Sequence, residues 1–142
     1  MKRVGIIQYH LMKERLQILL VEDDVFMQAI LNQSLLQHYQ LTIFNNGLDA
    51  IAFLQSGKIP DVIISDLNVP QVDGLQLIEQ LKSSGFFNAI PIIILSGEKS
   101  TEKKIECLEA GADDYIEKPF NPREIQARLK IILKRTGKIA IL

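Results

Sequence analysis

The chain is organised around one stretch, which reads VIISDLNVPQVDG and spans residues 62–74. An apolar run of strand length that ends on an acid predicts a buried strand, and this strand delivers Asp66 to the loop at its C-terminal edge. In open parallel α/β sheets, ligands bind at the carboxyl ends of the strands. Asp66 is therefore a candidate nucleophile or metal ligand, although an aspartate in this place can also simply cap a turn.

The composition predicts one soluble globular domain. The 142 residues suffice for one domain with a core and are too few for two ordinary ones. With a net charge of −1, the chain has no electrostatic basis for a nucleic-acid-binding face. A single cysteine, Cys107, favours a reducing, cytoplasmic compartment. The basic N-terminus lacks a signal-peptide cleavage site, and no run reaches the roughly 18 apolar residues of a membrane span.

Outward from Asp66, the pattern predicts five strands that alternate with five helices. Strands are expected at 16–21, 40–44, 62–66, 90–95 and 114–117, and helices at about 25–37, 48–55, 75–81, 100–110 and 122–135. In the fourth helix, Ile105 and Leu108 are expected to point inward. Alternation of this kind, with strands that are apolar on both faces, predicts a parallel sheet covered by helices on each side. We divide the chain into an N-terminal extension (1–15), one domain (16–135) and a C-terminal tail (136–142).

Polar side chains at the strand ends share one predicted edge of this sheet. Each group comes from a different strand: Asp23 and Asp24, Asp66 with Asn68, Ser96, and Lys118. Three carboxylates within about 5 Å would repel one another by roughly 3 kcal/mol per pair at an effective dielectric near 20, so the site needs positive charge. Magnesium and Lys118 would supply it, because magnesium binds one or two carboxylates together with waters and phosphate oxygens. The set then suits in-line attack of Asp66 on phosphorus.

These residues resemble the receiver domains of two-component response regulators. The resemblance covers residues 16–135, and its motifs are LVEDD at 20–24, Asp66 followed by Pro70 and by DG at 73–74, Ser96, and ADDYIEKPF at 112–120. It implies a flavodoxin-like, doubly wound (βα)5 fold with a five-stranded parallel sheet in the order 2-1-3-4-5. It also implies a phospho-accepting signalling protein rather than an enzyme.

The resemblance assigns a role to each polar residue at the edge. Asp66 would be the phospho-acceptor, Lys118 would bind the phosphoryl group, and Ser96 would be the switch hydroxyl. Magnesium would be held by Asp23, Asp24, Asp66 and the backbone carbonyl of Asn68. Tyr115 matches the switch aromatic, which turns inward after phosphorylation, and the Lys118–Pro119 peptide bond is expected to be cis. The implied partner is a sensor histidine kinase or a histidine phosphotransfer protein.

A second set of charged residues resembles receivers of winged-helix transcription factors. Those receivers form homodimers through the face of the fourth helix, fifth strand and fifth helix. The matching residues here are Lys104, Glu109, Asp113, Asp114, Arg128 and Lys130. A pair such as Asp114 with Arg128 would then bridge two copies of the chain. Alternatively, these are solvated helix charges of little energetic value.

Three other functions compete with this interpretation. An aspartate-nucleophile phosphatase also joins Asp, Lys and magnesium on a parallel sheet, but usually has a second acid two residues after the nucleophile, where this chain has Asn68. A receiver that serves only as a constitutive protein-interaction module would not need Asp66 and Lys118. A nucleotide-binding module is disfavoured because neither a G-x-G-x-x-G pattern nor a P-loop occurs.

Overall fold

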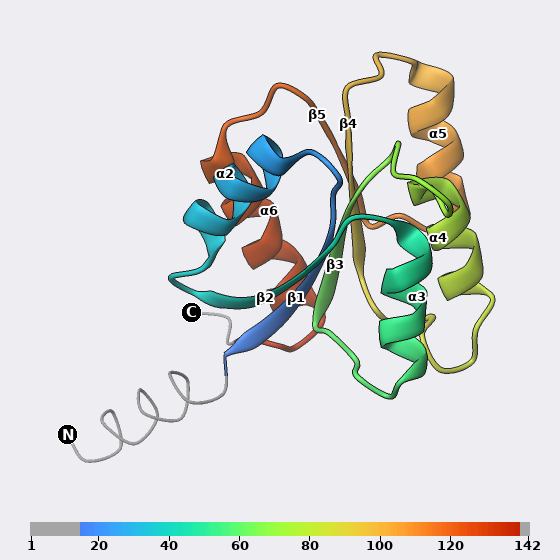
Figure 1. Ribbon diagram of the computed structural model, residues 1–142, viewed down its shortest axis with the longest axis horizontal. Helices are drawn as coiled ribbons and strands as arrows, with labels where there is room; N and C mark the ends of the chain where they lie inside the picture. The colour runs from blue at the N-terminus through green and yellow to red at the C-terminus, as the bar shows by residue number, and fades with distance from the viewer. Residues whose placement is uncertain (1–14, 140–142) are drawn as a thin grey trace.

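The structure, a computed structural model, describes residues 15–139 as five strands alternating with five helices (Figure 1). Their order is β1 (Leu16–Val21), α2 (Val25–Leu35), β2 (Tyr39–Phe44), α3 (Gly47–Gln55), β3 (Val62–Asp66), α4 (Gly74–Lys82), β4 (Ile92–Ser96), α5 (Thr101–Ala110), β5 (Asp114–Glu117) and α6 (Pro122–Arg135). The expected elements are all present, with boundaries that differ by a few residues at most. The extension 1–14 and the last three residues lie outside the described range.

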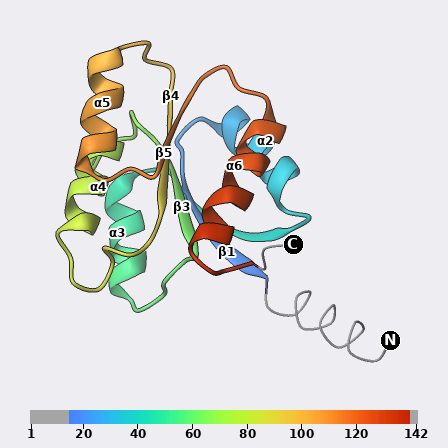
Figure 2. The ribbon, with the colours of Figure 1, turned by 180° about the vertical axis from the view of Figure 1, so that it is seen from behind.

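The five strands form one parallel sheet in the order β2-β1-β3-β4-β5, which confirms the predicted fold class. Helices α2 and α6 cover one face, and α3, α4 and α5 cover the other, as the two opposite views show (Figures 1 and 2). The register pairs Val21 with Ser65 and Asp66 with Leu95, so β1, β3 and β4 end at the same edge. The loops that follow these strands therefore lie together.

The core consists of two layers, one on each face of the sheet. Along β1, Ile18 and Leu20 belong to the layer under α2 and α6, whereas Leu19 and Val21 belong to the layer under α3 and α4. Side chains alternate between the faces of a strand, and here both faces are covered by helices. This is why the strands are continuous apolar runs in the sequence.

Side-chain caps begin all five described helices. The capping residues, whose side chains accept backbone N–H groups of the first turn, are Asp24, Asn46, Asp73, Ser100 and Asn121. Such a cap typically contributes about 1 kcal/mol to stability. At the other end of α5, Gly111 has a φ of 120°, which favours glycine over residues with a side chain. The expected roles of Asn121 and Gly111 are thereby confirmed.

The expected orientation of α5 was wrong. Ile105 and Leu108 are 47% and 41% exposed, and Cys107 is the fully buried residue of this helix. Because each helical residue turns by about 100°, Ile105 and Leu108 lie roughly 200° and 100° away from Cys107 around the helix. The helix buries only a narrow stripe against the sheet, and it leaves these two apolar side chains exposed.

Within residues 15–139, no helix has the length and apolar character needed to cross a membrane.

Candidate functional site

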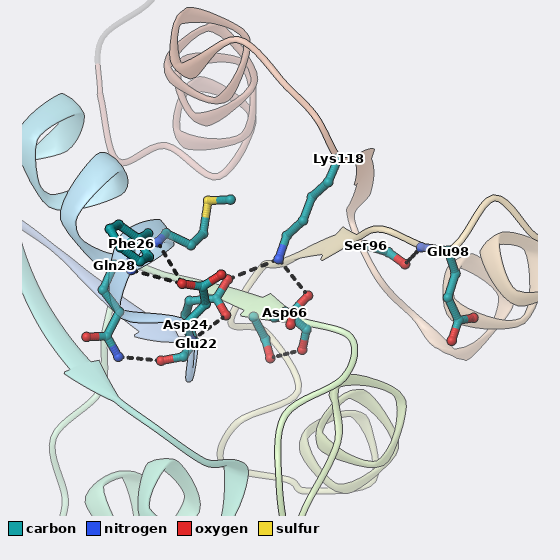
Figure 3. A network of polar contacts seen from close by, with 10 residues as sticks. Glu22, Asp24, Phe26, Gln28, Asp66, Ser96, Glu98 and Lys118 are labelled. Atoms are coloured by element: carbon teal, nitrogen blue, oxygen red, sulfur yellow. Dashed lines mark hydrogen bonds and ion pairs between the residues drawn. The ribbon is translucent and has the colours of Figure 1, made fainter.

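The polar side chains at the strand ends converge at the C-terminal edge of the sheet (Figure 3). Glu22 follows β1, Asp66 ends β3, Ser96 ends β4, and Lys118 follows β5. Glu22 and Ser96 are fully buried, and Asp66 is 8% exposed. Buried polar groups need partners. The contacts among these residues therefore define the site.

Three carboxylates form its centre. One oxygen each of Glu22, Asp23 and Asp66 lie within 4.8 Å of one another. Asp24 is not part of this cluster. Its Oδ1 instead accepts hydrogen bonds from the backbone N–H groups of Phe26, at 2.9 Å, and Met27, at 3.4 Å, and so caps α2. The structure therefore does not support Asp24 as a metal ligand.

Glu22 stands in the place that the sequence analysis gave to Asp24. The strand register explains the difference: Val21 pairs with Ser65, so the next residue, Glu22, lies beside Asp66. Two signals in the sequence could have found it. Glu22 comes directly after the apolar run of β1, and Asp24 stands directly before an apolar helix, where an N-cap is expected.

Lys118 neutralises part of this negative charge. Its Nζ lies 3.1 Å from Oε1 of Glu22 and 3.1 Å from Oδ1 of Asp66. Burial lowers the pKa of Lys118. The negative charges of Asp66 and Glu22, and the hydrogen bonds to them, raise this pKa by more than burial lowers it, so the net pKa lies above the ordinary value. The backbone N–H of Lys118 donates to the carbonyl of Ser96 at 2.7 Å, and the Lys118–Pro119 bond is cis, as expected.

The donor set fits a hard divalent cation. Three carboxylates face one ammonium group, so two negative charges are left in excess if all of these groups are ionised. Burial is the main cause that raises the pKa of Glu22, and the backbone N–H of Asp24, which donates to Oε2 at 3.2 Å, opposes it. A cation at this place would relieve both the repulsion and the burial penalty. Oxygen ligands of this kind are those that magnesium prefers.

Ser96 and Asn68 lie at the rim of the cluster and both contact Glu98. Ser96 Oγ accepts a hydrogen bond from the backbone N–H of Glu98 at 3.0 Å, and its side chain also lies close enough to the Tyr115 hydroxyl to lower the pKa of that group. The side chain of Asn68, which is exposed, reaches Oε1 of Glu98 from its Nδ2 at 3.4 Å. Residues of the β3–α4 and β4–α5 loops thus meet across the site.

Tyr115 is buried on β5, with 5% of its surface exposed. Its hydroxyl forms no hydrogen bond of ordinary length with residues 15–139; burial raises the pKa of Tyr115, and the neighbouring Ser96 side chain opposes this rise. The side chain is already turned inward in this structure, so the expected movement after phosphorylation stays a prediction.

The backbone of Gly74, at the start of α4, packs closely against the backbone of Asp66 and Leu67. A Cβ at Gly74 would lie 2.9 Å from Cα of Leu67 and 3.0 Å from the carbonyl oxygen of Asp66. The backbone N–H of Gly74 donates to the carbonyl of Leu67 at 2.8 Å. Because real Cβ contacts are longer, glycine lets the first turn of α4 pack directly under the loop that carries Asp66.

The second charged set lies on α5, β5 and α6, and its strongest pair is internal. Arg128 forms two hydrogen bonds, of 2.9 and 3.1 Å, with the Asp114 carboxylate of the same chain. Asp113 pairs with Arg135 at 3.2 Å and with Lys82 at 3.8 Å. Within the described part of the chain, the remaining members of the set form no ion pair; they are Lys104, Glu109 and Lys130. The structure therefore places the expected Asp114–Arg128 pair within one copy of the chain.

Known proteins share this architecture. The family model of the response regulator receiver domain matches residues 18–130. The response regulator MprA of Mycobacterium avium (strain 104) is 35% identical over 122 residues, which cover 85% of this chain and 52% of that protein. This chain thus spans about half the length of the curated relatives that it matches.

Solved structures agree with the family match. The chemotaxis response regulator CheY4 of Vibrio cholerae is similar, with a TM-score of 0.78 and 30% identity, over 84% of this chain and 100% of that one. The signal receiver domain of a signal transduction histidine kinase from Syntrophus aciditrophicus has a TM-score of 0.79 and 33% identity, over 89% and 96% of the two chains. The latter likeness leaves the output of this chain open, because that receiver is attributed to a kinase.

Proposed function

Because this chain belongs to the receiver domains of two-component response regulators, we propose that Asp66 accepts a phosphoryl group from a histidine kinase or a histidine phosphotransfer protein. Receiver domains are signalling modules rather than classical enzymes. The observation that carries the proposal is the buried carboxylate of Asp66, 3.1 Å from Lys118 and next to two further acids at the strand edge.

The transfer is a substitution at phosphorus. An oxygen of Asp66 attacks in line and forms the new O–P bond, while the P–N bond to the donor histidine breaks and its electron pair stays on that nitrogen, which regains a proton from solvent. The ammonium group of Lys118 lies beside Asp66 and can neutralise the oxygens of the transferred group. Glu22, Asp23 and Asp66, with the backbone carbonyl of Asn68, would hold magnesium. When bound, this ion supplies the positive charge that offsets the phosphoryl oxygens.

The signal then passes from the phosphoryl group to the output face. Ser96 ends β4 at the same sheet edge as Asp66, and its hydroxyl proton can bond to a phosphoryl oxygen on Asp66. Such a bond would pull the β4–α5 loop towards the site and bias the packing around Tyr115. This loop leads into α5, and β4 pairs with β5, which is followed by α6; we therefore propose α5, β5 and α6 as the output face.

Magnesium-dependent labelling tests this proposal. We expect the purified protein to gain the mass of one phosphoryl group when it is incubated with acetyl phosphate and magnesium, and to gain none when EDTA replaces magnesium. The readout is intact-protein mass spectrometry. Equal labelling in EDTA would argue against the metal site, and continuous turnover of p-nitrophenyl phosphate would favour the phosphatase alternative.

We also propose that phosphorylation promotes a homodimer through α5, β5 and α6. Ile105 and Leu108 give this face exposed apolar surface, and Lys104, Glu109 and Lys130 give it unpaired charges among the described residues. In sedimentation velocity, beryllofluoride with magnesium should shift the protein from monomer to dimer. Leu108→Glu should prevent the shift, because it places a charge in the apolar contact.

A matched control for the dimer is Leu36→Glu. Leu36 follows α2 and is 48% exposed, so it is as accessible as Leu108, but it does not belong to α5, β5 or α6. This variant should dimerise like the parent protein. Absence of a shift in the parent protein at high concentration would count against the dimer.

We place this domain in the cytoplasm, where its kinase or phosphotransfer partner would present a phosphohistidine. One buried cysteine, Cys107, is consistent with a reducing compartment. The net charge of −1 gives the domain no basis for direct contact with nucleic acid, so we propose that its output passes through protein contacts.

A further inference from the structure

The turn Asn45-Asn46-Gly47 joins β2 to α3; it contacts the β3–α4 loop directly and reaches the β1–α2 loop through Gln28 on α2. The function proposed above gives this turn no role. Its first residue contacts the β1–α2 side through Gln28, and its last residue contacts the β3–α4 loop. Both contacts come from one short segment beside the acidic cluster.

Gln28 connects the turn to the β1–α2 loop. Its Nε2 donates one hydrogen bond to the backbone carbonyl of Glu22 at 2.5 Å and another to Oδ1 of Asn45 at 2.8 Å. Figure 3 shows the first of these bonds beside the carboxylates. An amide NH₂ has two protons, so both bonds can exist at once. The backbone N–H of Glu22 also donates to the carbonyl of Phe44, the residue before the turn, at 3.0 Å.

Gly47 connects the same turn to the β3–α4 loop. Its backbone N–H points to the carbonyl of Pro70 at 3.4 Å. A Cβ at this position would lie 2.0 Å from the carbonyl oxygen of Val72, so only glycine permits the observed approach. Pro70 follows two residues after Asn68, whose carbonyl is a proposed ligand.

We propose that Gln28 and the turn Asn45-Asn46-Gly47 are positioning residues for the magnesium site. The carboxylates of Glu22 and Asp23 repel Asp66, and without a restraint the β1–α2 loop would relax away from it. Gln28 and Asn45 hold that loop in the geometry that a cation needs, as outer-shell hydrogen bonds do in metal sites. This inference rests on the proposed function, because it needs a magnesium site.

Magnesium affinity of the full chain, measured by calorimetric titration, tests the inference. Gln28→Met keeps the length of the side chain and removes its donors, and Asn45→Ala removes the acceptor from the other end of the bond. We expect each variant to bind magnesium more weakly, by about tenfold for Gln28→Met, as is typical for the loss of an outer-shell partner. Gln33→Met, an exposed glutamine on the same helix, is the control and should bind like the parent protein.

The double variant separates positioning from general loosening. Gln28→Met already breaks the bond to Asn45, so adding Asn45→Ala should weaken binding no further. If the two substitutions weakened magnesium binding additively, Gln28 and Asn45 would not act through their shared hydrogen bond. If only Gln28→Met weakened magnesium binding, the turn would have no positioning role. Parent-like affinity in both single variants would overturn the whole inference. By contrast, absence of binding in the parent protein, or full binding in Asp23→Asn, would mean that the proposed metal site itself is wrong.

Discussion

Asp66→Asn is expected to reduce phosphoryl labelling by acetyl phosphate or by a partner kinase to background. An amide has the shape of the carboxylate but lacks the anionic oxygen that attacks phosphorus. The fold should survive, because removing one of three mutually repelling charges offsets the loss of the Lys118–Asp66 ion pair, and Lys118 keeps its contact with Glu22. In magnesium-free buffer, the free energy of unfolding should therefore be unchanged or higher. Mass spectrometry measures the labelling, and urea unfolding followed by circular dichroism measures the stability.

Asp24→Asn is the matched control for this experiment. It makes the same chemical change at the same sheet edge, and asparagine caps a helix as well as aspartate does. Because Asp24 binds the first turn of α2 and lies outside the carboxylate cluster, this variant should label like the parent protein. Normal labelling of Asp66→Asn would refute the assignment of the acceptor. A labelling defect in Asp24→Asn would restore Asp24 to the metal site.

Lys118→Met is expected to impair labelling severely and to destabilise the magnesium-free protein. The ammonium group of Lys118 contacts both Glu22, whose side chain is fully buried, and Asp66. Removing one partner of a fully buried ion pair costs about 3–5 kcal/mol. The side chain of Lys118 is 20% exposed and solvent screens part of this loss, so we expect about 1–3 kcal/mol at neutral pH. Urea unfolding followed by circular dichroism provides the measurement.

The loss of unfolding free energy in Lys118→Met should depend on pH with a definite sign. The pKa of Lys118 is raised in the folded protein, so its stabilising effect is complete below the ordinary pKa of 10.5 and fades as the pH rises through the folded value. The pKa of Glu22 is raised above 4.5, so acidification neutralises this carboxyl and removes the need for a cation. Lys118→Met should therefore lower the free energy of unfolding, relative to the parent protein, by more at pH 7 than in acid near pH 4.5.

Lys130→Met serves as the control for charge removal. Lys130 is exposed on α6 and forms no ion pair among residues 15–139, so its loss should change stability little. If Lys118→Met unfolded at the same urea concentration as the parent protein at pH 7 without magnesium, the ion pairs of Lys118 with Glu22 and Asp66 would not stabilise the fold. Our account of the site's electrostatics would then be wrong.

The fold was predictable because the strands of a parallel sheet covered on both faces have a recognisable sequence pattern. Strands such as Val62–Asp66 are buried on both faces and thus read as continuous apolar runs, and each ends where a polar residue appears. Asn121 and Gly111 marked helix ends through capping chemistry that acts locally. In each case the information lies within a few residues of the feature.

The site was less predictable where the answer depends on the register between distant strands. Glu22, Asp23 and Asp24 are adjacent acids, and only the pairing of β1 with β3 decides that Glu22 lies beside Asp66 while Asp24 caps α2. The sequence likewise shows the charges of Asp114 and Arg128 but not whether they meet within one chain.

The exposure of α5 depends on tertiary packing in the same way. Ile105 and Leu108 have suitable spacing for an inner face, yet only the stripe at Cys107 meets the sheet. How much of a helix surface is covered depends on which neighbours reach it, and the helical period alone does not contain that information.

Borohydride trapping tests the central claim, that Asp66 carries the phosphoryl group, most directly. Borohydride reduces an aspartyl phosphate to homoserine, which peptide mass mapping locates in the chain. After treatment with acetyl phosphate and magnesium, we expect homoserine at residue 66 alone, and none when magnesium is withheld. Homoserine at Asp23 or Asp24, or an unmodified residue 66 in a protein that has gained a phosphoryl group, would contradict the account.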